Sequence, residues 1–222
     1  MLLPTSSIGR KIIMAITGQF LVLFILFHIS GNSSIFFHTL NAYAVFLHSL
    51  PVVVWGGRLV LFLAFVLHIW YGVVLSLENS AAKPKAHTIV KYRQATFAGR
   101  YQIWTGVVIA AFLMYHLLQF TAQITNPAIA AASHKDGFGR PDMIMMVVRS
   151  FQDIGVSGIY VVSLAALGLH LFHGMQSSIQ TWGWTNDRTL PVIRQSGNAA
   201  AIALFFWYCA IPVSIVMGIF TG

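Results

Sequence analysis

Acidic residues are scarce in this chain: Asp and Glu together number 5 among 222 residues. All charged residues make up 8% of the sequence, whereas roughly 25% is usual for a soluble domain. Hydrophobic residues make up 57%, and the mean hydropathy is +0.76. This balance excludes an ordinary soluble domain and predicts a protein that crosses a membrane several times.

Cysteine is almost missing as well, because Cys209 is the single one. One cysteine excludes an internal disulfide framework, a cysteine-based zinc site and a covalently attached c-type haem, which needs a C-x-x-C-H motif. The sequence also has no glycine-rich phosphate loop and no dinucleotide-binding fingerprint. Any flavin or nucleotide chemistry is therefore expected on a different chain.

Apolar runs are what the sequence has in abundance, and five of them reach the length of about 20 residues that a membrane-spanning helix needs. They cover residues 12–30, 52–77, 101–124, 152–182 and 198–219. We predict an all-α membrane protein with one domain over residues 1–222, in which the first four helices form a bundle. The first run lacks a small-residue cleavage site after it, so we expect a retained helix rather than a signal peptide.

The basic residues predict the orientation of these helices. With the N-terminus inside, the inner side receives Arg10, Lys11, Lys83, Lys85, Lys91, Arg93, Arg100, Arg188 and Arg194, and the outer side receives Arg58, Lys135, Arg140 and Arg149. This excess favours an N-terminus on the inner side of the membrane. We expect the protein in the cell inner (cytoplasmic) membrane. The net charge of +8 is spread over loops, which does not predict nucleic-acid binding. The loop from Lys83 to Arg100 suits lipid headgroups or a partner protein equally.

Histidines lie inside four of the apolar runs, where an unpartnered polar ring is costly. His28 and His116 fall in the outer half of the membrane, because each follows the inward start of its helix by about 15 residues. His68 and one of the neighbours His170 and His173 fall in the inner half. The depths therefore predict two pairs, each drawn from two helices.

Two such pairs are what two six-coordinate haems in a helical bundle require, since neutral imidazole is a common axial ligand. The alternative is that each ring is structural and bonded to a carbonyl or hydroxyl group. A repeat, T-G and H separated by nine residues, occurs at Thr17 and at Thr105. Its Thr lies on the same helix face as His28 or His116, so we take it to support the outer pair, although close helix packing explains it too.

A family resemblance enters with these segments. The stretches TGQFLVLFILFHISGN, LHIWYG, YQIWTGVVIAAFLMYH and LFHGMQSSIQTWGW resemble the four haem-bearing helices of the di-haem cytochrome b subunit of succinate dehydrogenases and fumarate reductases. The resemblance covers nearly the whole chain and rests on the order and spacing of the segments. It implies that His28 and His116 ligate an outer haem b, and that His68 and His173 ligate an inner one. His173 is preferred to His170 because Gly174 follows it.

The resemblance also implies partners and a reaction. Members of this family bind a flavoprotein subunit with FAD and an iron–sulfur subunit at the inner face, and exchange electrons with quinone, often menaquinone. Electrons would pass from succinate through both haems to quinone, or in reverse during fumarate reduction. The chain would thus be the membrane subunit of a succinate:quinone oxidoreductase, with the dicarboxylate site on another chain.

Three further residues are candidates for parts of this site. Arg58 is a candidate partner of a haem propionate, or else reaches toward lipid headgroups. His48 and Asp153 are candidates for proton exchange with quinone, with a solvated loop and a helix end as the ordinary alternatives. Every Asp and Glu lies in a loop or at the end of a predicted helix, so we expect no acidic proton path across the membrane.

Two other classes of protein remain as alternatives. A divalent-metal transporter can carry intramembrane histidines, but it usually adds Asp, Glu or Cys ligands along its path. A di-haem quinone cytochrome that serves another dehydrogenase would show the same histidine pattern. The loop from Asn126 to Phe151 contains the apolar stretch MIMMVV, which predicts a short interfacial helix over the outer haem or a surface decoration.

Overall fold

The computed structural model describes residues 6–82 and 97–221, and every long element in these ranges is a helix. The principal helices are α1 (Ser7–Asn32), α2 (Leu40–His48), α3 (Pro51–Ala81), α4 (Phe97–Arg100), α5 (Gln102–His116), α6 (Met143–Phe151), α7 (Ile154–Thr181) and α8 (Thr189–Val216). Short 3-10 turns occur at Ser33–Phe37, Pro127–Ile129 and Ala131–Ser133, and a π-helix, η3, spans Leu117–Thr121.

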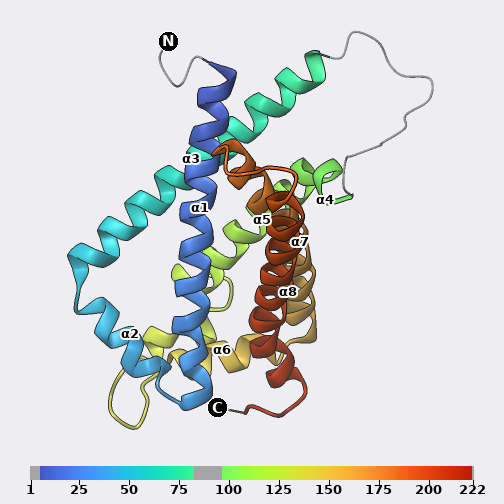
Figure 1. Ribbon diagram of the computed structural model, residues 1–222. Helices are drawn as coiled ribbons and strands as arrows, with labels where there is room; N and C mark the ends of the chain where they lie inside the picture. Colours follow the sequence, from blue (N-terminus) through green and yellow to red (C-terminus); the bar gives the residue numbers. More distant parts are fainter. Residues whose placement is uncertain (1–5, 83–96, 222) are drawn as a thin grey trace.

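Five helices are long and apolar enough to cross a membrane, which confirms the predicted number of spans. They are α1, α3, α5 with η3, α7 and α8. The start of α1 and the end of α8 lie at opposite ends of the bundle, as an odd number of crossings requires (Figure 1). The fifth helix begins at Thr189, nine residues before the predicted start at 198, because polar residues such as Arg194 continue the helix beyond the apolar run.

The helices surround α7. Helix α7 packs against α8, α5 and α1, and α3 lies on the other side of α1 and meets α5 only sparsely. A hydrogen bond from Gln19 to Ser178 joins α1 to α7. An ion pair of 2.6 Å between Arg10 and Glu78 joins α1 to α3 near the end of the bundle where α4 lies. We call this end the α4 end. The predicted basic loop, with Lys83, Lys85, Lys91 and Arg93, lies mostly outside the described residues.

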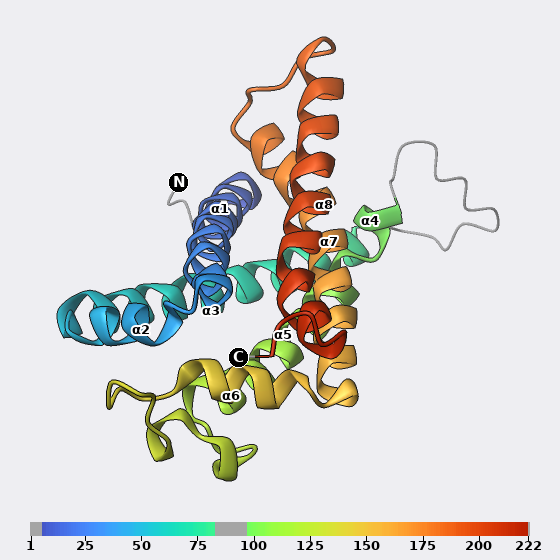
Figure 2. The same ribbon diagram turned by 90° about the horizontal axis from the view of Figure 1, so that it is seen from below.

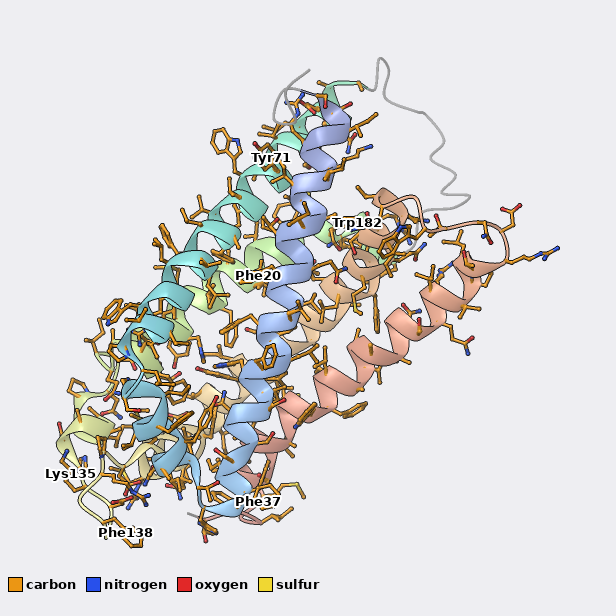
Figure 3. The ribbon with its side chains drawn as sticks, turned by 60° about the vertical axis from the view of Figure 1, so that its left-hand side comes forward. Phe20, Phe37, Tyr71, Lys135, Phe138 and Trp182 are labelled. Carbon is orange, nitrogen blue, oxygen red and sulfur yellow. The ribbon has the colours of Figure 1, made fainter. Side chains whose placement is uncertain are left out.

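The other end of the bundle, the α6 end, is closed by α2, α6 and the segment between η3 and α6 (Figures 1 and 2). The predicted short helix over MIMMVV is confirmed as α6, which Asp142 caps by accepting a hydrogen bond of 3.0 Å from the Met145 amide. Figure 3 places Phe37, Lys135 and Phe138 at this end and Trp182 toward the opposite one.

Asn41 of α2 holds this closure together, although it is only 3% exposed. Its amide group donates to the carboxylates of Asp136 and Asp142 at 3.2 Å, and its carbonyl oxygen accepts from the Ile144 amide at 3.0 Å. Desolvation alone would raise the pKa of Asp136. Hydrogen bonds from Arg140, Phe138 and Asn41 outweigh it and lower that pKa to about 2.

Candidate functional site

The histidines of the bundle meet in two pairs, and each pair takes one ring from each of two helices. In the first pair, His28 of α1 faces His116 of α5 with ring centroids 5.8 Å apart and planes at 86°. This is the outer pair that the sequence predicted. Both rings are half-buried, and Phe24 stacks on His28 at 5.3 Å.

In the second pair, His68 of α3 faces His170 of α7 with ring centroids 6.2 Å apart and planes at 66°. The sequence-based choice had been His173. That residue lies about one turn further along α7, and no ring contact or hydrogen bond joins it to His68 in the described part of the chain. Gly174, which had favoured His173, instead lies beside the Gln102 side chain of α5.

A threonine hydroxyl orients each ring of the His68–His170 pair. The Thr17 hydroxyl donates to the Ile13 carbonyl at 2.9 Å and lies 3.3 Å from His68 Nδ1. Because its one proton is already used, the hydroxyl oxygen accepts the hydrogen bond from Nδ1–H of His68. That bond fixes the tautomer in which Nε2 carries a free lone pair.

The same arrangement is repeated on the other side of this pair. The Thr105 hydroxyl donates to the Gln102 carbonyl at 3.0 Å and lies 3.1 Å from His170 Nδ1. Both threonines are buried, at 7% exposure. The T-G repeat was interpreted as support for the His28–His116 pair, but its threonines contact the other pair, which lies about 16 Å away along α1 at 1.5 Å per residue.

The glycines of the repeat permit this close approach. A Cβ atom at Gly18 would lie 3.1 Å from His68 Cε1, and one at Gly106 would lie 3.5 Å from His170 Cε1. The first distance is tighter than ordinary contact, whereas the second is ordinary van der Waals contact. A side chain at position 18 would therefore crowd the His68 ring.

The His28–His116 pair has different neighbours. His116 Nδ1 lies 3.1 Å from the hydroxyl of Tyr160, which donates to Gln119 Oε1 at 2.8 Å. The amide group of Asn32 lies 3.1 Å from Nε2 of His28. Sequence reasoning missed Tyr160 and Gln119; the signal for Gln119 was a polar residue three positions after His116 within an apolar run.

The spacing of both pairs fits a metal ion bound between two imidazole rings. Metal–imidazole bonds of about 2 Å place the centroids of two opposing rings roughly 6 Å apart, close to the 5.8 and 6.2 Å found here. Residues 6–82 and 97–221 contain no group of three or more His, Cys, Asp or Glu side chains that could hold a metal ion. The donor set is thus two imidazoles per site, which suits a haem iron better than a protein-only metal site.

The other predicted site residues lie apart from these rings. Arg58 is exposed and stacks its guanidinium group over the Trp55 ring at 4.8 Å. His48 is exposed, and its Nδ1 lies 2.8 Å from the Ala44 carbonyl of its own helix. Asp153 caps α7 by accepting from the Gly155 and Val156 amides at 2.8 and 3.2 Å.

Comparison of this chain with protein-family models, with curated proteins and with solved structures found no match. The interpretation of the two histidine pairs therefore depends on their own geometry and on the sequence resemblance described above.

Proposed function

We propose that this chain is a di-haem cytochrome b that carries electrons between a dehydrogenase and membrane quinone. The single observation that supports this most strongly is the pair of facing histidines at each of two levels of one membrane-spanning bundle. When bound, a haem b at each pair would supply one-electron transfer. The levels differ by about 16 Å of helix rise.

The proposed axial ligands are His28 with His116, and His68 with His170. Three of these rings present an Nε2 atom suited to iron, because Thr17, Thr105 and Tyr160 occupy Nδ1 of His68, His170 and His116. At His28 the ligand atom is the one that Asn32 contacts. Binding of iron there requires the Asn32 amide group to release Nε2.

The resemblance makes the proposal more specific. We propose that the partners are a flavoprotein subunit with FAD and an iron–sulfur subunit, that the reaction is succinate oxidation or fumarate reduction, and that the quinone is menaquinone. In this arrangement the N-terminus and the α4 end face the inside of the cell. The His68–His170 pair, which is nearer that end, then holds the inner haem and receives electrons from the iron–sulfur subunit.

Exchange of protons with quinone belongs to the opposite end in this proposal. His48 is the better candidate of the two named from the sequence, because it is exposed and lies at the end of α2. The Asp153 carboxylate already satisfies two amide groups of α7, and its removal would cost the helix its N-cap, worth about 1 kcal/mol.

A purification of the chain with its native partners tests the proposal. We expect two b-type haems per chain in a reduced-minus-oxidised spectrum, together with a flavoprotein, an iron–sulfur protein and succinate-dependent quinone reduction. A preparation with no haem would contradict the proposal. If the chain carries two haems but co-purifies with a different dehydrogenase, the proposal of a di-haem cytochrome b stands and only the proposed partner changes.

A further inference from the structure

Helix α5 stops being a regular α-helix directly after His116, and this irregularity positions polar groups. The π-helix η3 follows at Leu117–Thr121, and Gln123 then adopts a left-handed backbone with φ 57°. π-Helical turns are frequent at functional sites, and a left-handed non-glycine residue costs on the order of 1 kcal/mol. The result is that Gln119, within an apolar run, is buried against Tyr160 of α7.

The direction of the hydrogen bonds around Tyr160 follows from its single proton. The phenol donates to Gln119 Oε1 at 2.8 Å, so its oxygen accepts from Nδ1–H of His116 at 3.1 Å. Tyr160 is 6% exposed and Gln119 is 8% exposed, which leaves solvent little access to either group. The bond from His116 therefore lies in a medium of low polarity, where it is stronger than in water.

A small cavity lined in part by polar residues lies beside Gln119. Gln119, Gln123 and Ser150 contribute to its lining, and it has room for about one water molecule. Gln123 Oε1 and Ser150 Oγ are buried and have no hydrogen-bond partner among the described residues, and Ser150 is only 4% exposed. Each such atom costs about 1–3 kcal/mol when left unsatisfied, and one water bonded to both removes that cost.

We infer that Tyr160 is a positioning residue for His116, held in place by Gln119, and that one water molecule in the cavity beside Gln119 bonds to Gln123 and Ser150. The inference rests on the proposed function, because it assigns Tyr160 an effect on the iron that His116 binds. A hydrogen bond accepted from Nδ1–H makes the imidazole a stronger electron donor at Nε2, and this stabilises the oxidised iron. Tyr160 thus lowers the midpoint potential of the haem at the His28–His116 pair.

A redox titration of the Tyr160→Phe variant in the assembled complex tests this inference. We expect both haems to be retained, the midpoint potential of the His28–His116 haem to rise, and that of the His68–His170 haem to stay unchanged. The Gln119→Leu variant should shift the same potential in the same direction, because it releases the Tyr160 hydroxyl. It also serves as the second test if Tyr160→Phe does not assemble.

Tyr208→Phe is the matched control. The Tyr208 ring lies 6.4 Å from the His28 ring, but its hydroxyl donates to the Ile25 carbonyl at 2.6 Å rather than contacting an imidazole. Loss of this hydroxyl should leave both potentials unchanged. A merely structural role for Tyr160 would lower haem content without shifting a potential.

The outcomes separate the two proposals. A wild-type complex without haem overturns the proposed function. A wild-type complex with two haems whose potentials do not respond to Tyr160→Phe or Gln119→Leu overturns the inference alone. In a high-resolution structure of the complex, we expect density for one water between Gln123 and Ser150. A dry cavity there would overturn this part of the inference.

Discussion

The two histidine pairs are alike in spacing and unlike in what holds them. Each ring of the His68–His170 pair donates to a threonine hydroxyl, and both threonines lie within regular helices. The His28–His116 pair has a tyrosine beside one ring and an asparagine beside the other. Asn32 lies at the end of α1, and Tyr160 of α7 is bonded to Gln119 in the π-helix that follows α5.

This difference indicates how the two sites respond to their surroundings. A threonine whose hydroxyl is bonded to its own helix moves only with that helix, so the His68–His170 pair has rigid support. The Tyr160–Gln119 link connects the other pair to the cavity beneath α6, and so to the closure at the α6 end. We expect the His28–His116 pair to be the one that senses changes at that end.

The largest effect that distinguishes the pairs concerns His170 and His173. Replacement of His170 by Ala should remove the haem proposed for the His68–His170 pair, because one of its two proposed ligands is lost, and should leave the other proposed haem in place. Replacement of His173 by Ala should leave both. Haem quantification and redox titration of the two variants measure this, and loss of a haem from the His173→Ala variant alone would restore the sequence-based choice.

The threonines provide the next largest effect. Thr17→Val and Thr105→Val keep the side-chain shape but remove the acceptor for His68 or His170. Loss of such a supporting hydrogen bond usually weakens metal binding on the order of tenfold or more. We expect weaker haem binding and a raised midpoint potential at the His68–His170 pair. The effect should appear at this pair even though each threonine lies on the same helix as a histidine of the other pair.

Serine at the same positions is the control for these variants. Thr17→Ser and Thr105→Ser retain the hydroxyl and should restore the wild-type potential. A shift confined to the His28–His116 haem would show that the threonines support that pair, as the sequence repeat had suggested.

A smaller effect is expected from the two glycines, which differ in the space they leave. Alanine at position 18 would place its Cβ 3.1 Å from His68 Cε1, so the ring must move by a few tenths of an ångström. Alanine at position 106 has 3.5 Å and fits. Gly18→Ala should therefore broaden or shift the spectrum of the His68–His170 haem, and Gly106→Ala should not. Equal effects of the two variants would mean that the close approach of α1 to His68 does not determine the spectrum of this haem.

The smallest effect concerns the closure at the α6 end. Because the pKa of Asp136 is lowered in the folded protein, its charged form stabilises the fold above the ordinary value near 3.8, and this contribution is lost as the pH falls toward about 2. Hydrogen exchange of the α6 amides should accelerate over that interval in the wild type. In the Asp136→Asn variant the acceleration should be smaller, and the His68–His170 haem should be unaffected in both.

Much of the fold follows from composition, because apolar runs near the membrane length leave few alternatives. The first and second helices extend beyond the predicted spans and the fifth begins before its span, since polar residues near the membrane surface continue a helix once it has begun. Helix α7 lies within its predicted span. The His28–His116 pair was also predictable, because its two residues are the only histidines at their depth in those helices.

The His68 partner was not predictable from depth. His170 and His173 differ by three residues, about 4.5 Å of rise, and the choice depends on which face of α7 meets α3 and α5. Thr105 contacts His170 from α5, and no signal along α7 alone records that contact. The role of Tyr160 depends in the same way on the π-helix after His116, which brings Gln119 toward α7.

The most direct test of the account is the haem content of the wild-type chain, purified with its partners and measured as haem b per polypeptide. Two facing imidazole pairs predict two haems per chain with two resolved midpoint potentials. Both haems should be low-spin, with a nitrogen ligand on each side of the iron. A chain with no haem, or with a single haem that survives the loss of either pair, would contradict the account.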